Sequence, residues 1–343
     1  MPAKSTIHPR TNRFNATNMT KAKPFIKWVG GKGQLIPQLD TFLPADFDHW
    51  DDVTYIEPFV GGGAMLFYML QQYPQIRRAI INDINPDLTT CYQTVKDCPE
   101  PLIASLAKVE HTYLALTDED AKKNYYLTAR RRYNEETLDP VAKTTLFIFL
   151  NRTCFNGLYR VNRKGLFNVP FGKYEHPMIC DAATIRKDSE LLQRVEIMTG
   201  DFEVTFAHAQ GRTLFYFDPP YRPLSDTSNF NSYAKEAFND EAQIRLKTYC
   251  DRVHQAGFAF MLSNSDSKTA NGQEGFFDAL YAAYPIERVW ASRSINANPD
   301  RRGKLTEVLI HNYKDTRRAD QKSVPFVWDK EIRHEQQKLA ANR

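Results

Sequence analysis

Seven short runs rich in β-branched and aromatic residues constrain the fold of this chain more than any other feature of its sequence. Segments long enough to hold a helix separate the first five runs, and such alternation predicts a mostly parallel sheet wrapped by helices. The last two runs lack a helix-length spacer, so we expect them to pair as antiparallel strands. The predicted fold is therefore α/β, with a doubly wound, mostly parallel seven-stranded sheet. The runs span residues 54–59, 79–84, 194–200, 213–217, 258–265, 286–293 and 306–313.

The strand rhythm disappears between Cys91 and about Thr184. This segment reads as helices, residues 141–151 among them, followed by a loop rich in Gly, Asn and Arg. We therefore expect an inserted, mainly helical domain at 91–184, within a sheet domain formed by 23–90 and 185–313. The chain has 343 residues, which leaves room for two domains. Residues 1–22 are expected to be a flexible N-terminal tail and residues 314–343 a C-terminal tail.

One helix can be drawn in more detail, between the fourth and fifth runs. Asp240 followed by Gln243 predicts a capping box at its start, and Gly257 predicts its C-terminal stop. The apolar residues that should face the sheet repeat at helical spacing: Leu246, Tyr249, Cys250 and Val253.

Composition excludes several classes of protein. Five cysteines without CxxC pairing argue against a disulfide framework or a zinc site, and we predict no metal. The first residues lack the apolar core of a secretory signal, and no stretch approaches eighteen apolar residues, so we expect a soluble cytoplasmic protein without membrane association. A net charge of +4 is weak evidence for nucleic acid, although every charged residue between Arg152 and Lys173 is basic.

A glycine triplet, Gly61 to Gly63, follows the first run and precedes an apolar helix-like segment. Glycines let the backbone turn sharply and let a ligand approach closely, although a plain turn is the alternative. About twenty residues later Asp83 ends the second run, where doubly wound folds place a carboxylate against ribose hydroxyls; a helix cap is the other interpretation. Because the G-x-G-x-x-G pattern is absent, a nucleoside-bearing cofactor without a pyrophosphate is favoured over NAD.

A second glycine cluster, KWVGGK, holds Trp28 and Lys32 at residues 27–32. It lacks the P-loop pattern, so phosphate binding of that kind is excluded. A lysine beside an aromatic residue could hold a carboxylate and cover an adenine or an aliphatic chain. Alone, this signal is weak.

The fourth run ends on DPPY, residues 218–221. The two prolines remove N–H donors, so Asp218 and the Pro219 carbonyl form a rigid pair of acceptors at the carboxyl end of the sheet, with the Tyr221 ring beside them. Two acceptors that hold the hydrogens of an aromatic amine, such as that of adenine, would localise its lone pair toward an electrophilic methyl group. Tyr221 offers a surface on which an extruded base can stack. The alternative is a rigid turn with no chemistry.

Five motifs in order, KWVGGK, EPFVGGG, NDIN, GDF and DPPY, resemble the D12 class of Dam-type adenine-N6 DNA methyltransferases, over about residues 24–313. The resemblance implies a class I methyltransferase fold that uses S-adenosylmethionine and acts on double-stranded DNA, in many members at GATC. It implies the catalytic residues Asp218, Pro219 and Tyr221. It implies these contacts to the methyl donor: Trp28, Lys32, Phe59, Gly61, Asp83, Asp201, Phe202 and Asp218.

The inserted segment also resembles the family, in LNRTCFNGLYRVNRKGLFNVPFGKY, which implies a target-recognition domain. The residues expected to face DNA are Phe155, Asn156, Leu158, Arg160, Pro170 and Lys173. Arg160 can contact guanine bidentately and Phe155 or Leu158 can intercalate, whereas a solvated basic loop is the plain alternative. Arg163, Lys164 and Lys173 are expected to meet mainly phosphates. The late loop that holds Arg293, Ser294 and Asn296 is a further candidate for DNA contact.

Lys173 departs from the family pattern, because the GATC enzymes carry an arginine there. An ammonium group cannot reproduce the planar fork of arginine, so we expect a weaker or purely electrostatic contact at this position. GATC is the expected recognition sequence, but the sequence alone does not decide it. Three alternatives to a DNA adenine methyltransferase remain: a methyltransferase for cytosine N4, one for RNA adenine, and a catalytically inactive DNA-binding regulator. A cognate restriction endonuclease is a possible functional partner.

Overall fold

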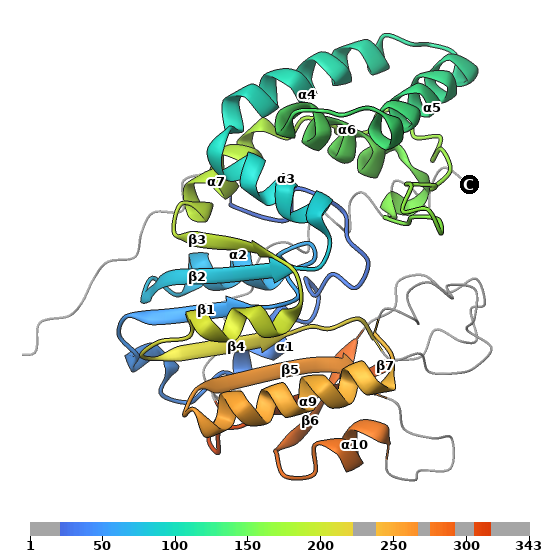
Figure 1. Ribbon diagram of the computed structural model, residues 1–343. Coiled ribbons are helices and arrows are strands. Elements are labelled where there is room, and N and C mark those ends of the chain that lie inside the picture. Colours follow the sequence, from blue (N-terminus) through green and yellow to red (C-terminus); the bar gives the residue numbers. More distant parts are fainter. Residues whose placement is uncertain (1–20, 222–237, 267–274, 292–304, 317–343) are drawn as a thin grey trace, which may run out of the picture.

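A seven-stranded sheet forms the centre of the molecule in a computed structural model that describes residues 21–221, 238–266, 275–291 and 305–316 (Figure 1). The order of the strands across the sheet is β3-β2-β1-β4-β5-β7-β6. The seven-stranded α/β fold predicted from the sequence is thereby confirmed. The strands are β1 (Val53–Glu57), β2 (Ile76–Asp83), β3 (Val195–Thr199), β4 (Thr213–Phe217), β5 (Ala259–Ser265), β6 (Ile286–Ala291) and β7 (Leu305–His311).

Strand direction follows the sequence prediction. The first five strands pair in parallel, whereas β7 is antiparallel to both of its neighbours, β5 and β6. Every residue of β1 and β4 is buried, which explains why these strands read as continuous apolar runs. The parallel arrangement brings the carboxyl ends of β1 to β5 to one edge, at the right in Figure 1.

Two hydrophobic cores, one on each face of the sheet, show why the fold is doubly wound. Leu214 and Tyr216 of β4 point into one core, and the alternating Phe215 and Phe217 point into the other. The first core includes α2 (Ala64–Gln72) and α1 (Ile36–Thr41), after which comes the short η1 (Phe47–His49). The second core includes η3 (Phe202–His208), α9 (Asp240–Gln255) and α10 (Phe276–Leu280).

Helix α9 is the helix drawn from the sequence, with one correction at its start. Its four predicted apolar residues are all buried, and Gly257 follows its end with a φ of +81°. The N-cap, however, is Asn239, whose side chain accepts a hydrogen bond from the Ala242 N–H, and Asp240 is already inside the helix.

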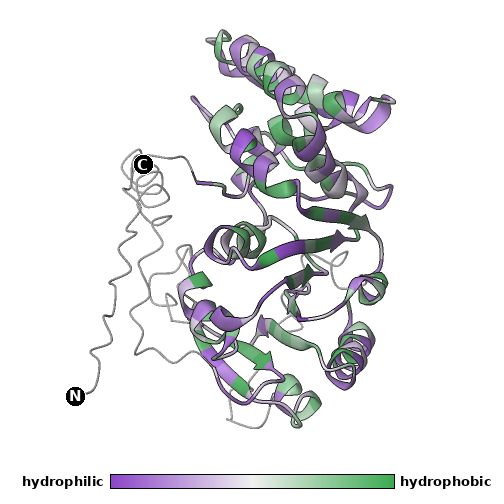
Figure 2. Cartoon of the chain, turned by 90° about the vertical axis from the view of Figure 1, so that its left-hand side faces the viewer, coloured by the Kyte–Doolittle hydropathy of each residue, from purple (hydrophilic) through white to green (hydrophobic). Residues whose placement is uncertain are grey.

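A second group of helices lies beyond β3, at the top of Figure 1. Polar and apolar residues are mixed along these helices, as expected for helices that bury one face (Figure 2). Their apolar faces continue the first core, so no separate core divides them from the sheet. The predicted boundaries at 91 and 184 fall inside α3 and α7, and the division into domains stays a prediction. The helices are α3 (Pro86–Asp97), α4 (Pro99–Leu114), α5 (Glu119–Glu135), α6 (Pro140–Thr153) and α7 (Ala182–Leu192).

Some predictions from the sequence concern residues that the structure does not describe. Residues 1–20, 317–343 and the loop with Arg293, Ser294 and Asn296 lie outside the described residues. Within the described ranges, no helix is long and apolar enough to cross a membrane. The same part of the chain holds no group of three or more His, Cys, Asp or Glu side chains placed to hold a metal, and all five cysteines are free thiols.

Candidate active site

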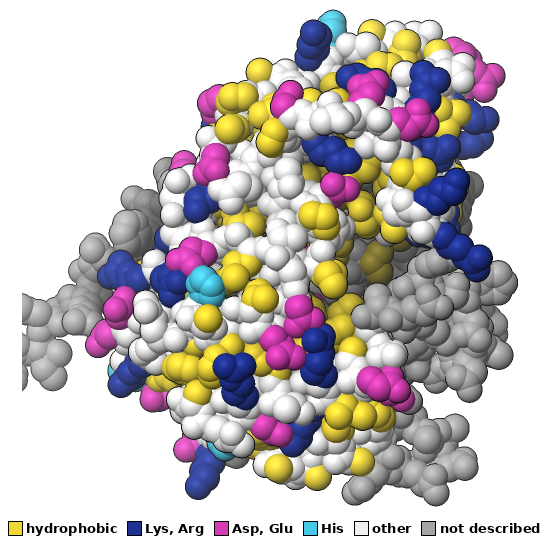
Figure 3. Space-filling view, viewed as in Figure 1, with side chains coloured by type: hydrophobic (Ala, Val, Ile, Leu, Met, Phe, Trp, Pro, Cys, Tyr) yellow, Lys and Arg dark blue, Asp and Glu magenta, His cyan; other side chains and the backbone are white. Residues whose placement is uncertain are grey.

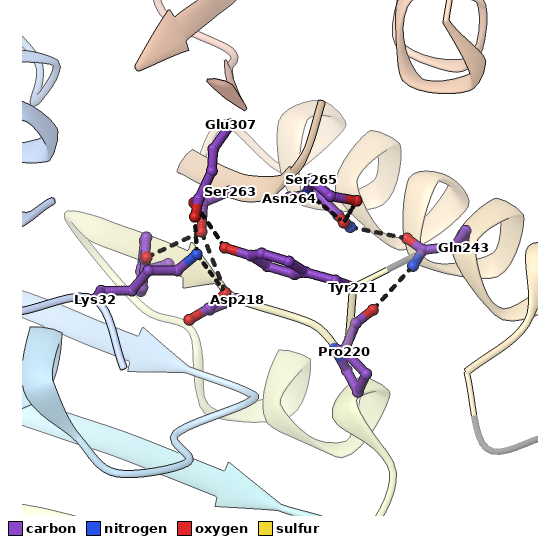
Figure 4. A network of polar contacts seen from close by, with 10 residues as sticks. Lys32, Asp218, Pro220, Tyr221, Gln243, Ser263, Asn264, Ser265 and Glu307 are labelled. Atoms are coloured by element: carbon purple, nitrogen blue, oxygen red, sulfur yellow. Dashed lines mark hydrogen bonds and ion pairs between the residues drawn. The ribbon is translucent and has the colours of Figure 1, made fainter. Parts of the chain in front are cut away.

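Asp218 follows the last residue of β4 at the carboxyl edge of the sheet (Figure 4). Its Oδ1 atom lies 3.1 Å from the Lys32 ammonium nitrogen and accepts a hydrogen bond from the Ser263 hydroxyl at 3.4 Å. The side chain is 19% exposed, so it is neither sealed in the interior nor freely solvated. We find no protein donor for its Oδ2 atom among the described residues, which leaves this oxygen able to accept from a substrate.

Burial raises the pKa of Asp218 to about 6. Lys32 acts against this rise by favouring the carboxylate, and the nearby Glu307 carboxylate adds to it. Asp218 is therefore an ionised acceptor at neutral pH that gains a proton under mildly acidic conditions.

Tyr221 is fixed in the same network. Its hydroxyl donates to Glu307 Oε2 at 2.6 Å, and the Lys32 ammonium lies 4.3 Å from the centre of its ring. Lys32 also donates to Glu307 Oε2 at 2.8 Å, so two donors share one carboxylate oxygen. The Pro220 carbonyl accepts a hydrogen bond from the Gln243 amide on α9 at 3.2 Å, which holds the proline turn in place.

Sequence analysis singled out neither Glu307 nor Glu57, two carboxylates whose charges act on or near Asp218. Glu307 comes from β7, Ser263 from β5, and the buried Glu57 ends β1. Burial raises the pKa of Glu57 well above its usual range, and the Tyr55 hydroxyl donates to it at 2.9 Å. Polar residues at the carboxyl ends of buried strands are the signal that could have pointed to Glu57 and Ser263. Glu307 lies near the amino end of β7 and reaches the same edge of the sheet only because β7 is antiparallel to β5.

The glycine triplet and Asp83 meet as the sequence suggested. Asp83 accepts hydrogen bonds from the Gly61 N–H at 3.2 Å and from the Asn85 N–H at 2.9 Å. Asn85, not Asp83, is the N-cap of α3, so the helix-cap interpretation of Asp83 was wrong. The turn is further fixed by the Tyr92 hydroxyl, which donates to the Gly61 carbonyl at 2.9 Å. Burial raises the pKa of Asp83.

Trp28 lies against the glycine triplet and links it to the helical group. A Cβ atom on Gly61, whose φ is +48°, would lie 2.9 Å from the Trp28 ring. The tryptophan ring also stacks on Tyr159 of the loop after α6, with ring centres 5.4 Å apart. Glycine is required here because both the backbone conformation and the close aromatic contact exclude a side chain.

The remaining predicted cofactor residues extend the same edge of the sheet. The Phe59 ring packs against Phe202 at 5.3 Å between ring centres. Asp201 caps η3 by accepting from the Glu203 N–H, and its carboxylate pairs with Arg245 at 2.6 Å. The ends of β1 to β4 thus hold six of the eight residues that the family resemblance assigned to the methyl donor, and Trp28 and Lys32 come from the turn before α1. The roles of all eight toward the donor stay predictions.

The predicted DNA-facing residues lie on a hairpin-like loop that follows α6. Cys154 pairs with Phe171 and Val161 with Phe167, which sets residues 154–161 against 167–171. Phe155, Asn156 and Pro170 are exposed on this loop, and Asn156 has a left-handed φ of +56°. Leu158 is half-buried against the core, so it is presented less openly than Phe155, of which 52% is exposed.

Arg160 and Lys173 are exposed and already have partners within the protein. Arg160 donates through Nε to Asn168 Oδ1 at 2.8 Å and through Nη2 to the Asn168 carbonyl at 3.3 Å. Lys173 pairs with Glu119 of α5 at 2.7 Å. Figure 3 shows Lys and Arg side chains along the right-hand edge of the helical group. This side corresponds to the carboxyl edge of the sheet in Figure 1.

Comparison with known proteins gives consistent matches. Residues 28–295 match the family described as D12 class N6 adenine-specific DNA methyltransferase. The chain is 44% identical over 296 residues to the type II methyltransferase M.MjaIII of Methanocaldococcus jannaschii, covering 85% of this chain and 100% of that protein. It is 38% identical over 301 residues to the type II methyltransferase M1.LlaDCHI of Lactococcus lactis, covering 86% and 97%. It is 32% identical over 292 residues to the DNA adenine methylase of Vibrio cholerae, covering 85% and 96%.

Proposed function

The chain belongs to the D12 class of N6 adenine-specific DNA methyltransferases, and from this premise we propose that it methylates the exocyclic N6 amine of an adenine extruded from double-stranded DNA at a specific site. The observation that carries the proposal is Asp218, an acceptor held by Lys32 at the carboxyl end of the sheet, with the Tyr221 ring beside it.

The glycine turn and its surroundings fit S-adenosylmethionine, the methyl donor of the family. Gly61 lets the backbone turn tightly beneath the Trp28 ring, and Asp83 adds a carboxylate at the place where this class of fold binds ribose hydroxyls. Phe59 and Phe202 supply an aromatic wall beside them. When bound, the donor supplies an electrophilic methyl group. Trp28, Lys32 and Asp201 complete the proposed set of contacts.

Asp218 and the Pro219 carbonyl then act on the adenine amine. Each oxygen accepts one N–H of the amine, which draws its lone pair out of conjugation with the ring and toward the methyl group. The amine carries positive charge as its bond to the methyl carbon forms and the bond from that carbon to the donor sulfur breaks. The ionised Asp218 stabilises that charge until one amine proton is lost to solvent, which leaves neutral N6-methyladenine. Lys32 keeps the carboxylate ionised and oriented, and Tyr221 provides the surface on which the base stacks.

The hairpin-like loop at 154–173 is proposed to recognise the DNA sequence. Asn168 holds Arg160 through Nε and through one N–H of Nη2, which leaves the Nη1 N–H groups and the second Nη2 N–H for a guanine edge. The exposed Phe155 is placed to act as a wedge between base pairs. Asn156, Leu158, Pro170 and Lys173 complete this surface, and Arg163 and Lys164 meet phosphates. We propose GATC as the site, read with a lysine in place of the usual arginine at 173.

The names of two relatives, type II methyltransferases, support a role beside a restriction endonuclease of the same specificity. We include such an enzyme as a functional partner of the proposed activity.

The function is tested by incubating the full chain with tritiated S-adenosylmethionine and duplexes that differ from GATC at one base pair. Nucleoside analysis of the product should give N6-methyladenine, with the GATC duplex labelled fastest. Label on cytosine, label on RNA in preference to DNA, or equal labelling of all duplexes would refute the proposal. Absence of any transfer, with both ligands bound, would favour a DNA-binding regulator.

A further inference from the structure

Glu307 has an unusual position for a residue of a sheet strand. Strand β7 places it opposite Ser265 of β5 and Val289 of β6, so the backbone around it is fixed on both sides. Its side chain is 13% exposed and points to the carboxyl edge, where Oε2 accepts from Tyr221 at 2.6 Å and from Lys32 at 2.8 Å (Figure 4).

We propose that Glu307 is the positioning residue of the methyl-transfer site. By accepting hydrogen bonds from both the Tyr221 hydroxyl and the Lys32 ammonium, it fixes these two groups before the adenine binds. This inference rests on the proposed function and adds to it a residue outside the five family motifs.

Fixing these two groups matters because both belong to irregular parts of the chain. Lys32 lies in the glycine-rich turn before α1, and Tyr221 lies beyond the end of β4. Neither has regular secondary structure to hold its side chain, whereas Glu307 is anchored by two neighbouring strands. A rigid second layer of contacts is what keeps catalytic groups in a productive geometry.

The arrangement also decides which face of the tyrosine receives a base. Lys32 covers one face of the ring at 4.3 Å. A base therefore stacks on the opposite face, and the hydrogen bond to Glu307 holds the hydroxyl end of the ring in place, which restrains rotation of the side chain about its Cα–Cβ bond. Tyr221→Phe keeps the ring and removes only this hydrogen bond, so it isolates the restraint from the stacking surface.

Glu307 also acts on Asp218 through charge. Both carboxylates contact the same ammonium, so the Glu307 charge competes for Lys32 and raises the pKa of Asp218. The other groups around Asp218 are the Ser263 hydroxyl from β5, the Tyr216 phenol from β4, and Tyr55 and Glu57 from β1. Without the Glu307 charge, Lys32 is left to act on Asp218 alone and the Asp218 carboxylate is easier to form.

The experiment uses four variants of the full chain: Glu307→Gln, Glu307→Ala, Tyr221→Phe and the double variant Glu307→Ala/Tyr221→Phe. Single-turnover methyl transfer is followed from about pH 5 to pH 8 with DNA and S-adenosylmethionine saturating. Glu287→Gln is the matched control, since it removes one acidic charge from the neighbouring strand β6 at an exposed position without contact to Lys32.

Glu307→Gln should move the acid limb of the rate to lower pH by roughly one unit, since a like charge beside the carboxyl is removed. Glu287→Gln and Tyr221→Phe should leave the limb in place. Glu307→Ala should slow transfer by about tenfold to a hundredfold through misplacement of Tyr221 and Lys32. The double variant should be little slower than Glu307→Ala, because both changes remove the same contact.

Two results would overturn the inference: a limb for Glu307→Gln that coincides with the parent, or losses for Glu307→Ala and Tyr221→Phe that multiply. Either is sufficient. Calorimetric binding of S-adenosylmethionine shows whether each variant is folded. If Glu307→Ala does not bind, the inference is judged from the pH profile of Glu307→Gln alone. Failure of the parent to label adenine at all refutes the proposed function, and only a parent that does label adenine tests Glu307.

Discussion

The pH dependence of methyl transfer is the prediction that the geometry of Asp218 makes most sharply. Its pKa is raised to about 6 by burial, against the opposing effect of Lys32. Only the ionised carboxylate carries the negative charge that stabilises the positive charge developing on the amine, so the chemical step should follow the ionised fraction. Lowering the pH from about 7.5 to about 5 reduces that fraction, and with it the rate, by about tenfold.

The assay is a single-turnover quench with DNA and S-adenosylmethionine prebound, because it separates the chemical step from binding and product release. Rates should be nearly constant above about pH 7 and fall with a slope of one below about pH 6. Lys32→Met should move the fall to higher pH, because the charge that favours the carboxylate is removed. A rate that stays constant down to about pH 5, or a fall that Lys32→Met leaves unmoved, would refute the assignment of Asp218 as the ionised acceptor.

Two further substitutions test the glycine turn and the recognition loop. Gly63→Ala places a Cβ atom 2.5 Å from the Tyr92 hydroxyl at a φ of +74°, and should lower the free energy of unfolding by about 1–3 kcal/mol. The control is Gly211→Ala, where φ is +57° and the space around the new Cβ atom is open. Equal denaturant midpoints for the two variants would contradict the steric argument. Arg160→Ala should lose about 1–3 kcal/mol of discrimination at one guanine, whereas Arg163→Ala should weaken binding to all duplexes alike. If the Arg160→Ala protein ranks mismatched duplexes as the parent does, Arg160 does not read the DNA sequence.

The fold followed from the sequence because its signals are local. A short run rich in aromatic residues that ends on a turn signal, such as 213–217, favours a strand buried on both faces, and Gly257 after the apolar repeat of α9 marks a helix end. The wrong N-cap predicted for α9, Asp240 in place of Asn239, also came from a local signal. Asn239 and Asp240 are both good N-caps, and the backbone conformation of Asn239, with a ψ of −173°, decides between them.

The inner network of the site could not be read from the sequence because it depends on long-range contacts. Lys32 was expected to contact a ligand, yet its ammonium group contacts Asp218 and, 275 residues away, Glu307. In TEVLIHNY the glutamate reads as an ordinary polar position of an alternating strand. Asn168 similarly supports Arg160 only because residues 154–161 fold back on 167–171. Which partners meet is decided by the order of the strands and the path of the loop.

The stability of Asp218→Asn is linked to the same chemistry. The folded-state pKa of Asp218 is raised above the ordinary value of 3.8, so the stability that its protonated form contributes is lost as the pH rises toward about 6. A rise from 3.8 to about 6 corresponds to about 3 kcal/mol of unfavourable ionisation at neutral pH. An amide avoids this cost, and Lys32 keeps Glu307 as its partner.

The most direct test of the account is therefore to measure transfer to adenine and the free energy of unfolding for Asp218→Asn and the parent at about pH 7.5. We expect the variant to bind S-adenosylmethionine and DNA, to transfer no methyl group, and to be more stable than the parent by up to about 3 kcal/mol, with the difference vanishing below about pH 4. A variant that methylates adenine at close to the parental rate would contradict the claim that an ionised Asp218 makes the amine reactive.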